Sequence, residues 1–382
     1  MTKIDRIETS ILEIPTIRGH VLSMATMRTQ VIVLVSVRFS DGSVGIGEGT
    51  TIGGLSYCLE SPESIQSAIE TYIAPVLEGR DADDVNGAIY LMDKAVRGNA
   101  IAKAAVEIAL WDGLGKRLDV SVATLFGGAV HKQLPVAWTL ASGNSETDIE
   151  EAHEMLESRR HNIFKLKIGK RSVRDDVDHV RRIKEAVGDK ASIRVDVNQA
   201  WTLTEARWGL SGLQDAGCEL VEQPICVKNL SGMTELTQGY EIAVMADEVL
   251  NGPEDAFAVA SARAADVFAV KVAQSGGLKR ANEVIGIGQS AGIGLYGGTM
   301  LESGLSTAAA LQLFATVNTL EWGTELFGPL LLVDEILATP VGYSDFCVQV
   351  PTGAGLGVAL DQDKVAFYCR DRSRSVSALA GE

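Results

Sequence analysis

Charged residues recur at the ends of short apolar runs through the middle of the chain. These residues are Lys165 and Lys167 in IFKLKIG, Asp196 in SIRVDVN, Glu222 in CELVEQP and Asp247 in IAVMADE. Successive charges from Lys167 onward are separated by roughly 25 residues, about the length that a strand, a crossover helix and two short loops require. A charge at the same place in each unit predicts parallel strands whose carboxyl ends supply a single site.

Asp196, Glu222 and Asp247 form a candidate metal site. Adjacent strands lie about 5 Å apart, so carboxylates at the ends of consecutive strands can converge on one ion. Three carboxylates without His or Cys favour Mg²⁺ or Mn²⁺ over zinc. Alternatively, each acid is a solvated loop residue or a helix N-cap. That explanation suits any one of them, but it is less suited to three acids at equivalent strand ends. Asn198 and Glu248 are expected beside the ligands rather than on the ion.

Lys165 and Lys167 are expected on the same side of their strand, because side chains alternate with a period of two. Buried lysines are unfavourable unless they are paired, and nearby carboxylates would supply partners. Cationic neighbours and desolvation lower a lysine pKa, so we expect one of the two to lose its proton near neutrality and act as a base. The alternative is a pair on an exposed edge strand, which their apolar neighbours disfavour. Lys271 is expected across the site from Lys167, and Glu325 on the side of Lys167.

The strands that would position these residues follow from the hydrophobic pattern. We predict them at 134–140, 163–169, 192–198, 218–224, 242–248, 266–272, 292–298 and 320–326, with helices between them. Eight is the number of strands that closes a packed barrel. The sequence therefore predicts a (β/α) barrel over residues 131–340.

A different pattern precedes the barrel. Residues 4–14 and 30–38 alternate as strands do, and Asp41-Gly42 predicts a turn into a return strand. From Ser61 to about Arg117 the pattern is helical, and Ser61-Pro62 is a helix-start signal. Strands followed by helices predict a separate α+β capping domain at residues 1–130. Residues 341–382 are expected to return to it and to end in a frayed tail.

Two loops are candidates for substrate contact. Ile52 and Tyr57 lie in TTIGGLSY, a stretch without periodicity, which we expect either to close over a substrate or to be an ordinary connecting turn. In YGGTM, Gly297 and Gly298 are expected to leave room for substrate or for tight strand-to-helix packing, with a small phosphate-type nest as the alternative. Gly298 and Thr299 are candidate substrate-binding residues. The five histidines, His20 among them, fall outside the predicted strand ends, so no catalytic histidine is predicted.

Composition limits the classes of partner. The net charge of −16 argues against nucleic acid and against an anionic membrane surface. No run approaches the roughly 18 apolar residues of a membrane span, and the first residues do not resemble a signal peptide. The five cysteines are scattered without CxxC spacing, as expected of buried free thiols in a reducing compartment. A cytoplasmic enzyme is therefore expected.

The order of these charged residues carries a resemblance to a known family. Lys-x-Lys on the second strand, Asp, Glu and Asp on the next three and Lys on the sixth resemble the enolase superfamily, and within it the muconate-lactonising subgroup. The segments RVDVNQAW, VEQPI, MADE, GLYGGTMLE and WGTELFGPLLL are similar to those of its bacterial members. The resemblance covers nearly the whole chain, with no departure at the acidic residues or the lysines.

This resemblance implies a modified TIM barrel of the enolase C-terminal type with an amino-terminal capping domain. The implied reaction is reversible cycloisomerisation of cis,cis-muconate to muconolactone in catechol breakdown, through an enolate stabilised by Mn²⁺ or Mg²⁺. Lys167 would be the general acid/base and Lys165 would hold the substrate carboxylate. Lys271 would contribute charge, and Glu325 would be a further acid/base or an orienting carboxylate. The resemblance also implies a small dicarboxylate substrate, no organic cofactor and a homo-oligomer, commonly an octamer.

Several alternatives share most of these features. Chloromuconate cycloisomerase, o-succinylbenzoate synthase and dipeptide epimerase belong to the same subgroup and would differ in the capping loops. A catalytically silent homologue with a binding role is a different class, which the intact lysines and carboxylates disfavour. A metal-dependent hydrolase on the same barrel would gain nothing from lysines on both sides of the site.

Overall fold

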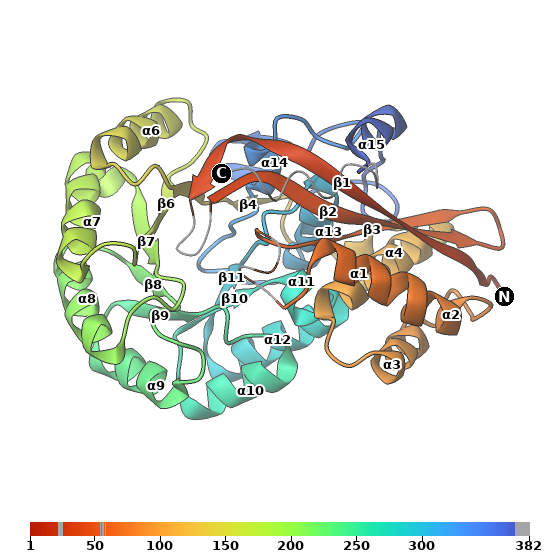
Figure 1. Cartoon of the computed structure of the whole chain (residues 1–382), viewed down its shortest axis with the longest axis horizontal. Coiled ribbons are helices and arrows are strands. Elements are labelled where there is room, and N and C mark those ends of the chain that lie inside the picture. Colours follow the sequence, from red (N-terminus) through yellow and green to blue (C-terminus); the bar gives the residue numbers. More distant parts are fainter. Residues whose placement is uncertain (22–25, 54, 56, 58, 371–382) are drawn as a thin grey trace.

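The computed structural model describes residues 1–21, 26–53, 55, 57 and 59–370. Its two main parts are an antiparallel sheet covered by helices and a curled parallel sheet surrounded by helices (Figure 1). The α/β fold predicted from the sequence, a barrel with an α+β capping domain, is confirmed.

The capping sheet is a three-stranded meander, in the order β1 (Ile4–Val21), β2 (Thr26–Phe39) and β3 (Val44–Thr50). The first two strands extend well beyond the predicted 4–14 and 30–38, because their pairing continues past a register shift to His20 and Met27. The resulting hairpin reaches across the barrel toward β6 (Figure 1).

The helices of the capping domain are α1 (Pro62–Ala68), the π-helical turn η2 (Ile69–Ile73), α2 (Ala74–Leu77), α3 (Val85–Ala95), α4 (Ala100–Leu118) and α5 (Val122–Leu125). Of these, α1, η2, α2 and α4 pack against the strands of the sheet. Ser61 caps α1 by accepting the Ser64 amide hydrogen, as its place before Pro62 predicts. Close approach of α4 to β3 requires glycine, since a Cβ at Gly47 would lie 2.0 Å from the Ala105 carbonyl oxygen.

Seven parallel strands form the barrel sheet, namely β5 (Trp138–Leu140), β6 (Ile163–Lys167), β7 (Ser192–Asp196), β8 (Leu220–Glu222), β9 (Ala243–Ala246), β10 (Val267–Val270) and β11 (Gly294–Gly297). The predicted strand 134–140 is wrong as a single element. Its first part is β4 (Gln133–Pro135), which pairs instead with β13 (Cys347–Gln349) in a separate small sheet with β12 (Tyr343–Ser344).

The predicted eighth strand, 320–326, is also wrong as a strand and is reduced to bridges at Thr324. A turn brings the Gly323 amide 3.0 Å from the Leu320 carbonyl oxygen, and Gly323 has a left-handed backbone with φ of 68°, which interrupts the extended chain. Thr324 still bridges to both Val136 and Gly297. This short segment therefore closes the barrel between its first and last strands.

The barrel helices follow their strands in turn and lie outside them (Figure 1). They are α6 (Ser145–Glu157), α7 (Val173–Val187), the 3₁₀ turn η3 (Gly188–Lys190), α8 (Leu203–Asp215), α9 (Leu230–Gly239), α10 (Pro253–Ala262), α11 (Val272–Ser275), α12 (Leu278–Ala291) and α13 (Gly304–Phe314). No helix in the described part of the chain is long and apolar enough to cross a membrane.

The carboxyl-terminal segment runs back to the capping sheet through α14 (Gly328–Leu331) and α15 (Gln362–Tyr368). Cys369 bridges to Leu12 of β1, and the Arg370 guanidinium pairs with Glu13 at 2.5 Å and also with Glu63. The frayed tail predicted at the end of the chain lies outside the described residues. The four described cysteines are free as predicted, but only Cys218 is fully buried.

Carboxylates of the capping domain cap two barrel helices. Glu48 on β3 accepts hydrogen bonds from the backbone amides of Ser303 (3.0 Å) and Ser306 (3.1 Å) at the start of α13. Glu107 on α4 accepts those of Leu278 (2.8 Å) and Lys279 (2.9 Å) at the start of α12. A carboxyl group at a helix N-terminus accepts hydrogen bonds from the free backbone amides, so the two parts of the chain are joined by directed polar contacts.

Candidate active site

Parallel strand register brings the predicted charged residues into one row. Lys167 is the Cα partner of Asp196 across β6 and β7, and Asp196 is the partner of Glu222 across β7 and β8. Glu222 pairs with Met245, so Asp247 lies two positions further along on the same side. The regular spacing noted in the sequence thus becomes side-chain proximity at the carboxyl ends of the strands.

Asp196, Glu222 and Asp247 can together hold a metal ion. Each offers a carboxylate oxygen within 4.8 Å of the other two, and all three residues are buried. Glu222 Oε1 is buried without a hydrogen-bond partner in the described part of the chain, which leaves an acceptor that a cation would satisfy. An oxygen-only donor set fits a hard divalent cation such as Mg²⁺ or Mn²⁺.

Lys165 lies within ion-pair distance of three carboxylates. Its Nζ is 2.8 Å from Glu222, 2.5 Å from Glu325 and 3.6 Å from Asp196. Lys167 Nζ bonds Asp196 Oδ2 at 2.5 Å and the Asn198 side-chain oxygen at 3.3 Å. The Lys167 side chain is 13% exposed and that of Lys165 only 2%, so Lys167 is the more accessible of the pair to a bound molecule.

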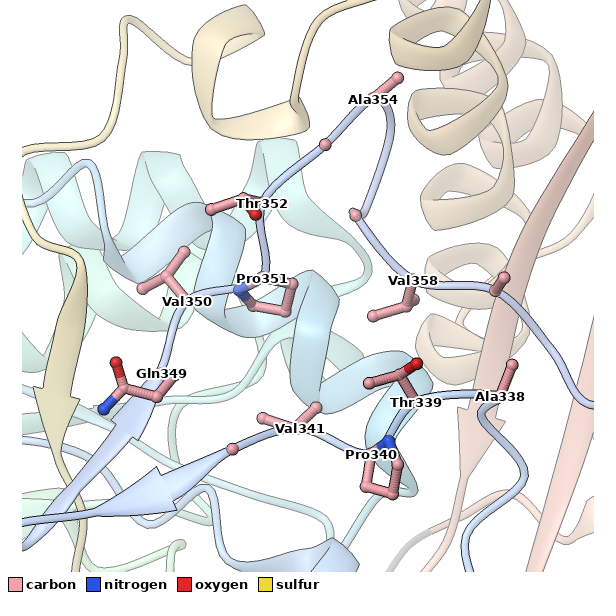
Figure 2. Close-up of a pocket in the computed structure, with 14 residues that line it drawn as sticks. Ala338, Thr339, Pro340, Val341, Gln349, Val350, Pro351, Thr352, Ala354 and Val358 are labelled. Carbon is pink, nitrogen blue, oxygen red and sulfur yellow. The ribbon is translucent and has the colours of Figure 1, made fainter.

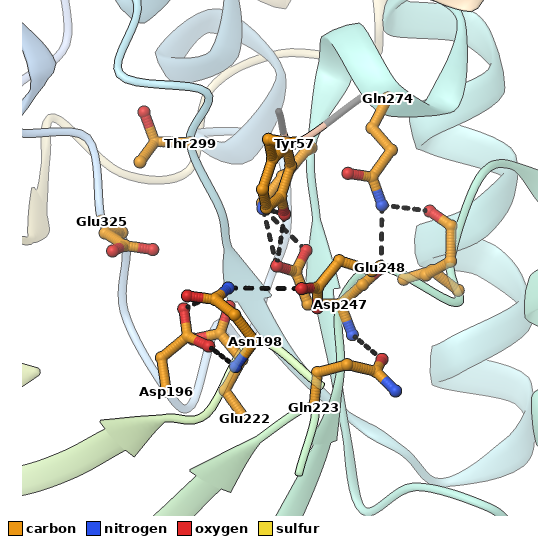
Figure 3. Close-up of polar contacts among 12 residues, drawn as sticks. Tyr57, Asp196, Asn198, Glu222, Gln223, Asp247, Glu248, Gln274, Thr299 and Glu325 are labelled. Atoms are coloured by element: carbon orange, nitrogen blue, oxygen red, sulfur yellow. Dashed lines mark hydrogen bonds and ion pairs between the residues drawn. The ribbon is translucent and has the colours of Figure 1, made fainter. Parts of the chain in front are cut away.

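Lys271 lies against Asp247, on the other side of the cluster. Its Nζ is 2.7 Å from Asp247 and 2.7 Å from the Tyr57 hydroxyl, which itself donates to Asp247 Oδ2 at 2.8 Å. Figure 3 shows Tyr57 pointing down to Asp247, with Glu325 separate on the far side. Lys165 with Lys167 and Lys271 therefore flank the carboxylates from two directions, as the sequence predicts.

Burial and charge set the ionisation of this cluster. Burial opposes ionisation of Asp196, but Lys167 and Lys165 lower its pKa to about 2. Burial and repulsion from Asp196 raise the pKa of Glu222 well above its ordinary value. Lys165 is not the lysine of the pair that loses its proton near neutrality. Burial alone would lower its pKa, but Glu222, Glu325 and Asp196 raise it well above the ordinary value.

Amide side chains hold the acidic residues in place. Asn198 donates to Asp196 Oδ2 and Glu248 Oε1, at 3.2 Å each, which agrees with their expected position beside the ligands. Gln223 accepts the Asp247 backbone amide hydrogen at 3.1 Å, and Gln274 donates to the Asp247 carbonyl oxygen at 2.8 Å (Figure 3). The sequence analysis missed both glutamines, although Gln223 directly follows a predicted ligand and Gln274 lies just after Lys271.

The cavity beside this cluster has a barrel side and a capping side. Its lining comprises Lys165, Lys167, Asp196, Lys271, Thr299, Leu301 and Glu325 from the barrel, with His20, Ile52 and Tyr57 from the capping domain. Ile52, Tyr57 and Thr299 thus lie where we expected substrate-contact residues. Gly298 has another role, because a Cβ there would lie 2.7 Å from Lys271 Cγ, so this glycine leaves room for the lysine. His20 was not predicted.

A second cavity, of about 540 Å³, lies in the carboxyl-terminal segment (Figure 2). Figure 2 shows Thr339, Pro340, Val341, Pro351 and Thr352 around it. None of the residues that line it carries an ionisable side chain. This cavity therefore lacks the groups that proton transfer or metal binding requires.

Comparison with known proteins assigns the chain to a family. Residues 6–127 match the amino-terminal domain of the mandelate racemase/muconate lactonizing enzyme family, and residues 147–364 match the enolase C-terminal domain-like family. The chain belongs to the mandelate racemase/muconate lactonizing enzyme family of the enolase superfamily. Members of this superfamily use a divalent metal, and the buried acidic triad of this chain could bind one.

Two relatives and one solved structure show the similarity in detail. The chain is 52% identical to muconate cycloisomerase 1-1 of Acinetobacter lwoffii over 96% of this chain and 97% of that protein. It is 46% identical to a chloromuconate cycloisomerase of Delftia acidovorans over 96% and 99%. The crystal structure of muconate lactonizing enzyme from Pseudomonas fluorescens complexed with muconolactone superposes with a TM-score of 0.95. It is 50% identical and covers 97% of this chain and all of that one.

Proposed function

We propose that this protein catalyses the reversible cycloisomerisation of cis,cis-muconate to muconolactone. The observation that carries the proposal is the side-chain cluster itself, in which three buried carboxylates converge within 4.8 Å between Lys165 and Lys167 on one side and Lys271 on the other. Sequence identity of 52% to a muconate cycloisomerase over nearly the full chain supports it. The chloromuconate cycloisomerase relative, at 46%, makes chlorinated muconates the second candidate substrates.

In this reaction one substrate carboxylate adds across a conjugated double bond, and the carbon next to the other carboxylate gains a proton. We assign that proton to Lys167 Nζ, because Lys167 is the most exposed of the three lysines and lines the cavity. In the reverse direction Lys167 takes the same proton back from carbon. Asp196 and Asn198, which bond its Nζ, would hold the ammonium in one orientation.

Asp196, Glu222 and Asp247 are assigned as ligands of a divalent cation. When bound, that cation supplies positive charge that stabilises the negative charge developing on the substrate carboxylate. Lys165 and Lys271 are assigned to hold the dianionic substrate by charge, since both remain protonated against their carboxylate partners. Glu325 is assigned to position Lys165, whose Nζ it contacts at 2.5 Å.

The test is the loss of conjugated-diene absorbance of cis,cis-muconate, measured with Mn²⁺ and then with a chelator. Rapid, chelator-sensitive loss with muconolactone as product is the expected result. Absence of turnover by protein that still binds Mn²⁺ would contradict the substrate assignment. Chloromuconates, precursors of succinylbenzoate and dipeptides would then be assayed in turn.

The proposal has four further parts, which rest on the family resemblance, the composition and the hydrophobic pattern of the sequence. The metal is Mn²⁺ with Mg²⁺ as the alternative, and no organic cofactor takes part. The assembly is a homo-octamer, which sedimentation would test. The protein acts in the cytoplasm, in catechol breakdown. The chain divides into a capping domain at 1–130, a catalytic barrel at 131–340 and a returning segment at 341–382, boundaries that limited proteolysis would test.

A further inference from the structure

The mechanism assigned above does not use His20, although this residue lines the cavity. The side chain is 1% exposed, and its Nδ1 has no hydrogen-bond partner among the described residues. A buried polar atom without a partner is unfavourable unless something else satisfies it. Burial, together with the positive charges of Lys167, Arg18 and Lys165, lowers the His20 pKa to about 3, so the imidazole is neutral at neutral pH.

Both strands of the capping hairpin are fixed to the barrel beside His20. On β1, Arg18 donates to Glu151 at 2.9 Å and to the Thr139 carbonyl oxygen at 3.3 Å. On β2, Gln30 donates to the carbonyl oxygens of Leu301 at 2.8 Å and Met300 at 3.1 Å. These contacts tie the described parts of both strands to the barrel, and they help to fix the backbone that carries His20.

The other residues of the capping domain that line the cavity cannot replace His20 as a donor. Ile52 is apolar. The Tyr57 hydroxyl already donates to Asp247 and accepts from Lys271. Among the described capping-side residues that line the cavity, His20 is therefore the one with a polar side-chain atom that has no partner. A dicarboxylate that places one end at the acidic cluster directs its other end away from that cluster.

We propose that His20 is a substrate-binding residue that donates a hydrogen bond to the substrate carboxylate remote from Asp196, Glu222 and Asp247. The inference rests on the proposed function, in which this remote carboxylate is the one that cyclises. One of its oxygens forms the new bond to carbon, while the oxygen held by His20 becomes the carbonyl oxygen of the lactone. The proton that Lys167 delivers goes to a different atom, so His20 binds and orients without exchanging a proton.

The test compares a dicarboxylate with a monocarboxylate of equal length. Dissociation constants of adipate and hexanoate are measured by calorimetry on the full chain with Mn²⁺. His20→Phe should weaken adipate binding by about ten- to hundred-fold, the loss expected for a hydrogen bond to a charged group, and change hexanoate binding less than about two-fold. His20→Asn, whose amide can occupy the position of Nδ1, should restore part of the loss.

His161→Phe is the matched control. His161 is also fully buried with one ring nitrogen unpartnered among the described residues, but it stacks on Trp138 and does not line the cavity. The His161→Phe variant should leave the ratio of the adipate and hexanoate dissociation constants unchanged. Equal weakening of both ligands by His20→Phe, no weakening, or the same change of ratio in His161→Phe would overturn the assignment. If His20→Phe weakens adipate binding selectively but the wild type does not convert cis,cis-muconate, the proposed reaction fails and His20 remains assigned to binding of the remote carboxylate.

Discussion

The two sides of the cavity are built differently. On the barrel side, Lys167, Asp196 and Glu222 stand in one register row on adjacent strands, and each is paired with an opposite charge. On the capping side, His20 comes from β1 and Tyr57 from a loop, and Nδ1 of His20 has no hydrogen-bond partner among the described residues. Replacement of a charged residue on the barrel side leaves its buried partner without an opposite charge, whereas replacement of His20 leaves no described partner of its Nδ1 unsatisfied. Under the proposed function, the barrel side performs the chemistry and the capping side selects the substrate.

The largest expected effect is on the barrel side, at Lys167. Replacement by Ala removes the group to which we assign the proton transfer, so turnover should fall by about 10³-fold or more while substrate still binds. A steady-state assay measures the loss of turnover, and equilibrium binding measures whether the variant still binds substrate. Lys170→Ala, at an exposed position on the same segment, is the control and should retain activity. Normal turnover by the Lys167 variant would break the proposed division of roles.

The next largest effect is expected at Glu222. Glu222→Gln replaces a buried carboxylate by a neutral amide, so it should weaken Mn²⁺ binding by at least about 100-fold. Titration with Mn²⁺ measures the change directly, without reference to activity. Glu219→Gln changes an exposed carboxylate just before the same strand and should bind Mn²⁺ as the wild type does. Unchanged affinity in the Glu222 variant would remove this residue from the metal site.

A smaller effect is expected on the capping side, at Tyr57. Tyr57→Phe removes the hydroxyl that bonds Asp247 and Lys271 but keeps the ring in the cavity. We expect turnover to change by less than about ten-fold, with KM changing at least as much as kcat. Tyr240→Phe, which removes a hydroxyl bonded to the Arg207 carbonyl oxygen outside the cavity, controls for loss of a phenol. A loss as large as that of Lys167→Ala would place Tyr57 with the barrel residues.

The smallest effect on catalysis is expected where the two sides join, at Glu107. Burial raises the pKa of Glu107 from 4.5 to about 7 in the folded chain. Its contribution to stability is therefore complete below about pH 4.5 and is lost as the pH rises through about 7, a change of about 3 kcal/mol. Glu107→Gln cannot titrate, so the melting temperature of the wild type relative to the variant should fall between pH 5 and 8.

Turnover of Glu107→Gln at constant temperature should stay close to that of the wild type. Glu283→Gln, at an exposed position on α12, serves as the control and should show no such pH dependence relative to the wild type. A flat difference between wild type and Glu107→Gln would show that this carboxyl titrates alike in folded and unfolded chains. Calorimetry at several pH values provides the melting temperatures.

Sequence alone could predict the barrel side because its signal is local. A charge such as Asp196 or Glu222 at the end of an apolar run is anomalous within a few residues, and parallel strands convert equal spacing into proximity. The glutamines that hold Asp247 were missed because an amide after a strand also occurs in ordinary loops. The direction of the Lys165 pKa shift could not be predicted from the local sequence. It depends on Glu325, a residue of the last strand-like segment, as well as on Glu222 and Asp196.

The capping side carried weaker signals. His20 lies inside a long strand whose sequence gives no sign of a nearby cavity, and its neighbours Lys165 and Lys167 are far along the chain. The predicted eighth strand failed for a related reason. Leu320 to Glu325 has a strand-like composition, but a turn closed by Gly323 leaves only Thr324 in bridging position. Long-range contacts place His20 at the cavity, and the backbone conformation of Gly323 interrupts the predicted strand. Neither can be recognised in the local sequence.

The caps that Glu48 and Glu107 place on α13 and α12 limit how this chain can be recombined with its relatives. A capping domain transplanted from another member would have to bring a carboxylate to both positions. Otherwise the recipient barrel would keep two helices whose first amides have lost their acceptors. Substrate preference should therefore be easier to transfer by exchanging His20, Ile52 and Tyr57 individually than by exchanging the domain that carries them.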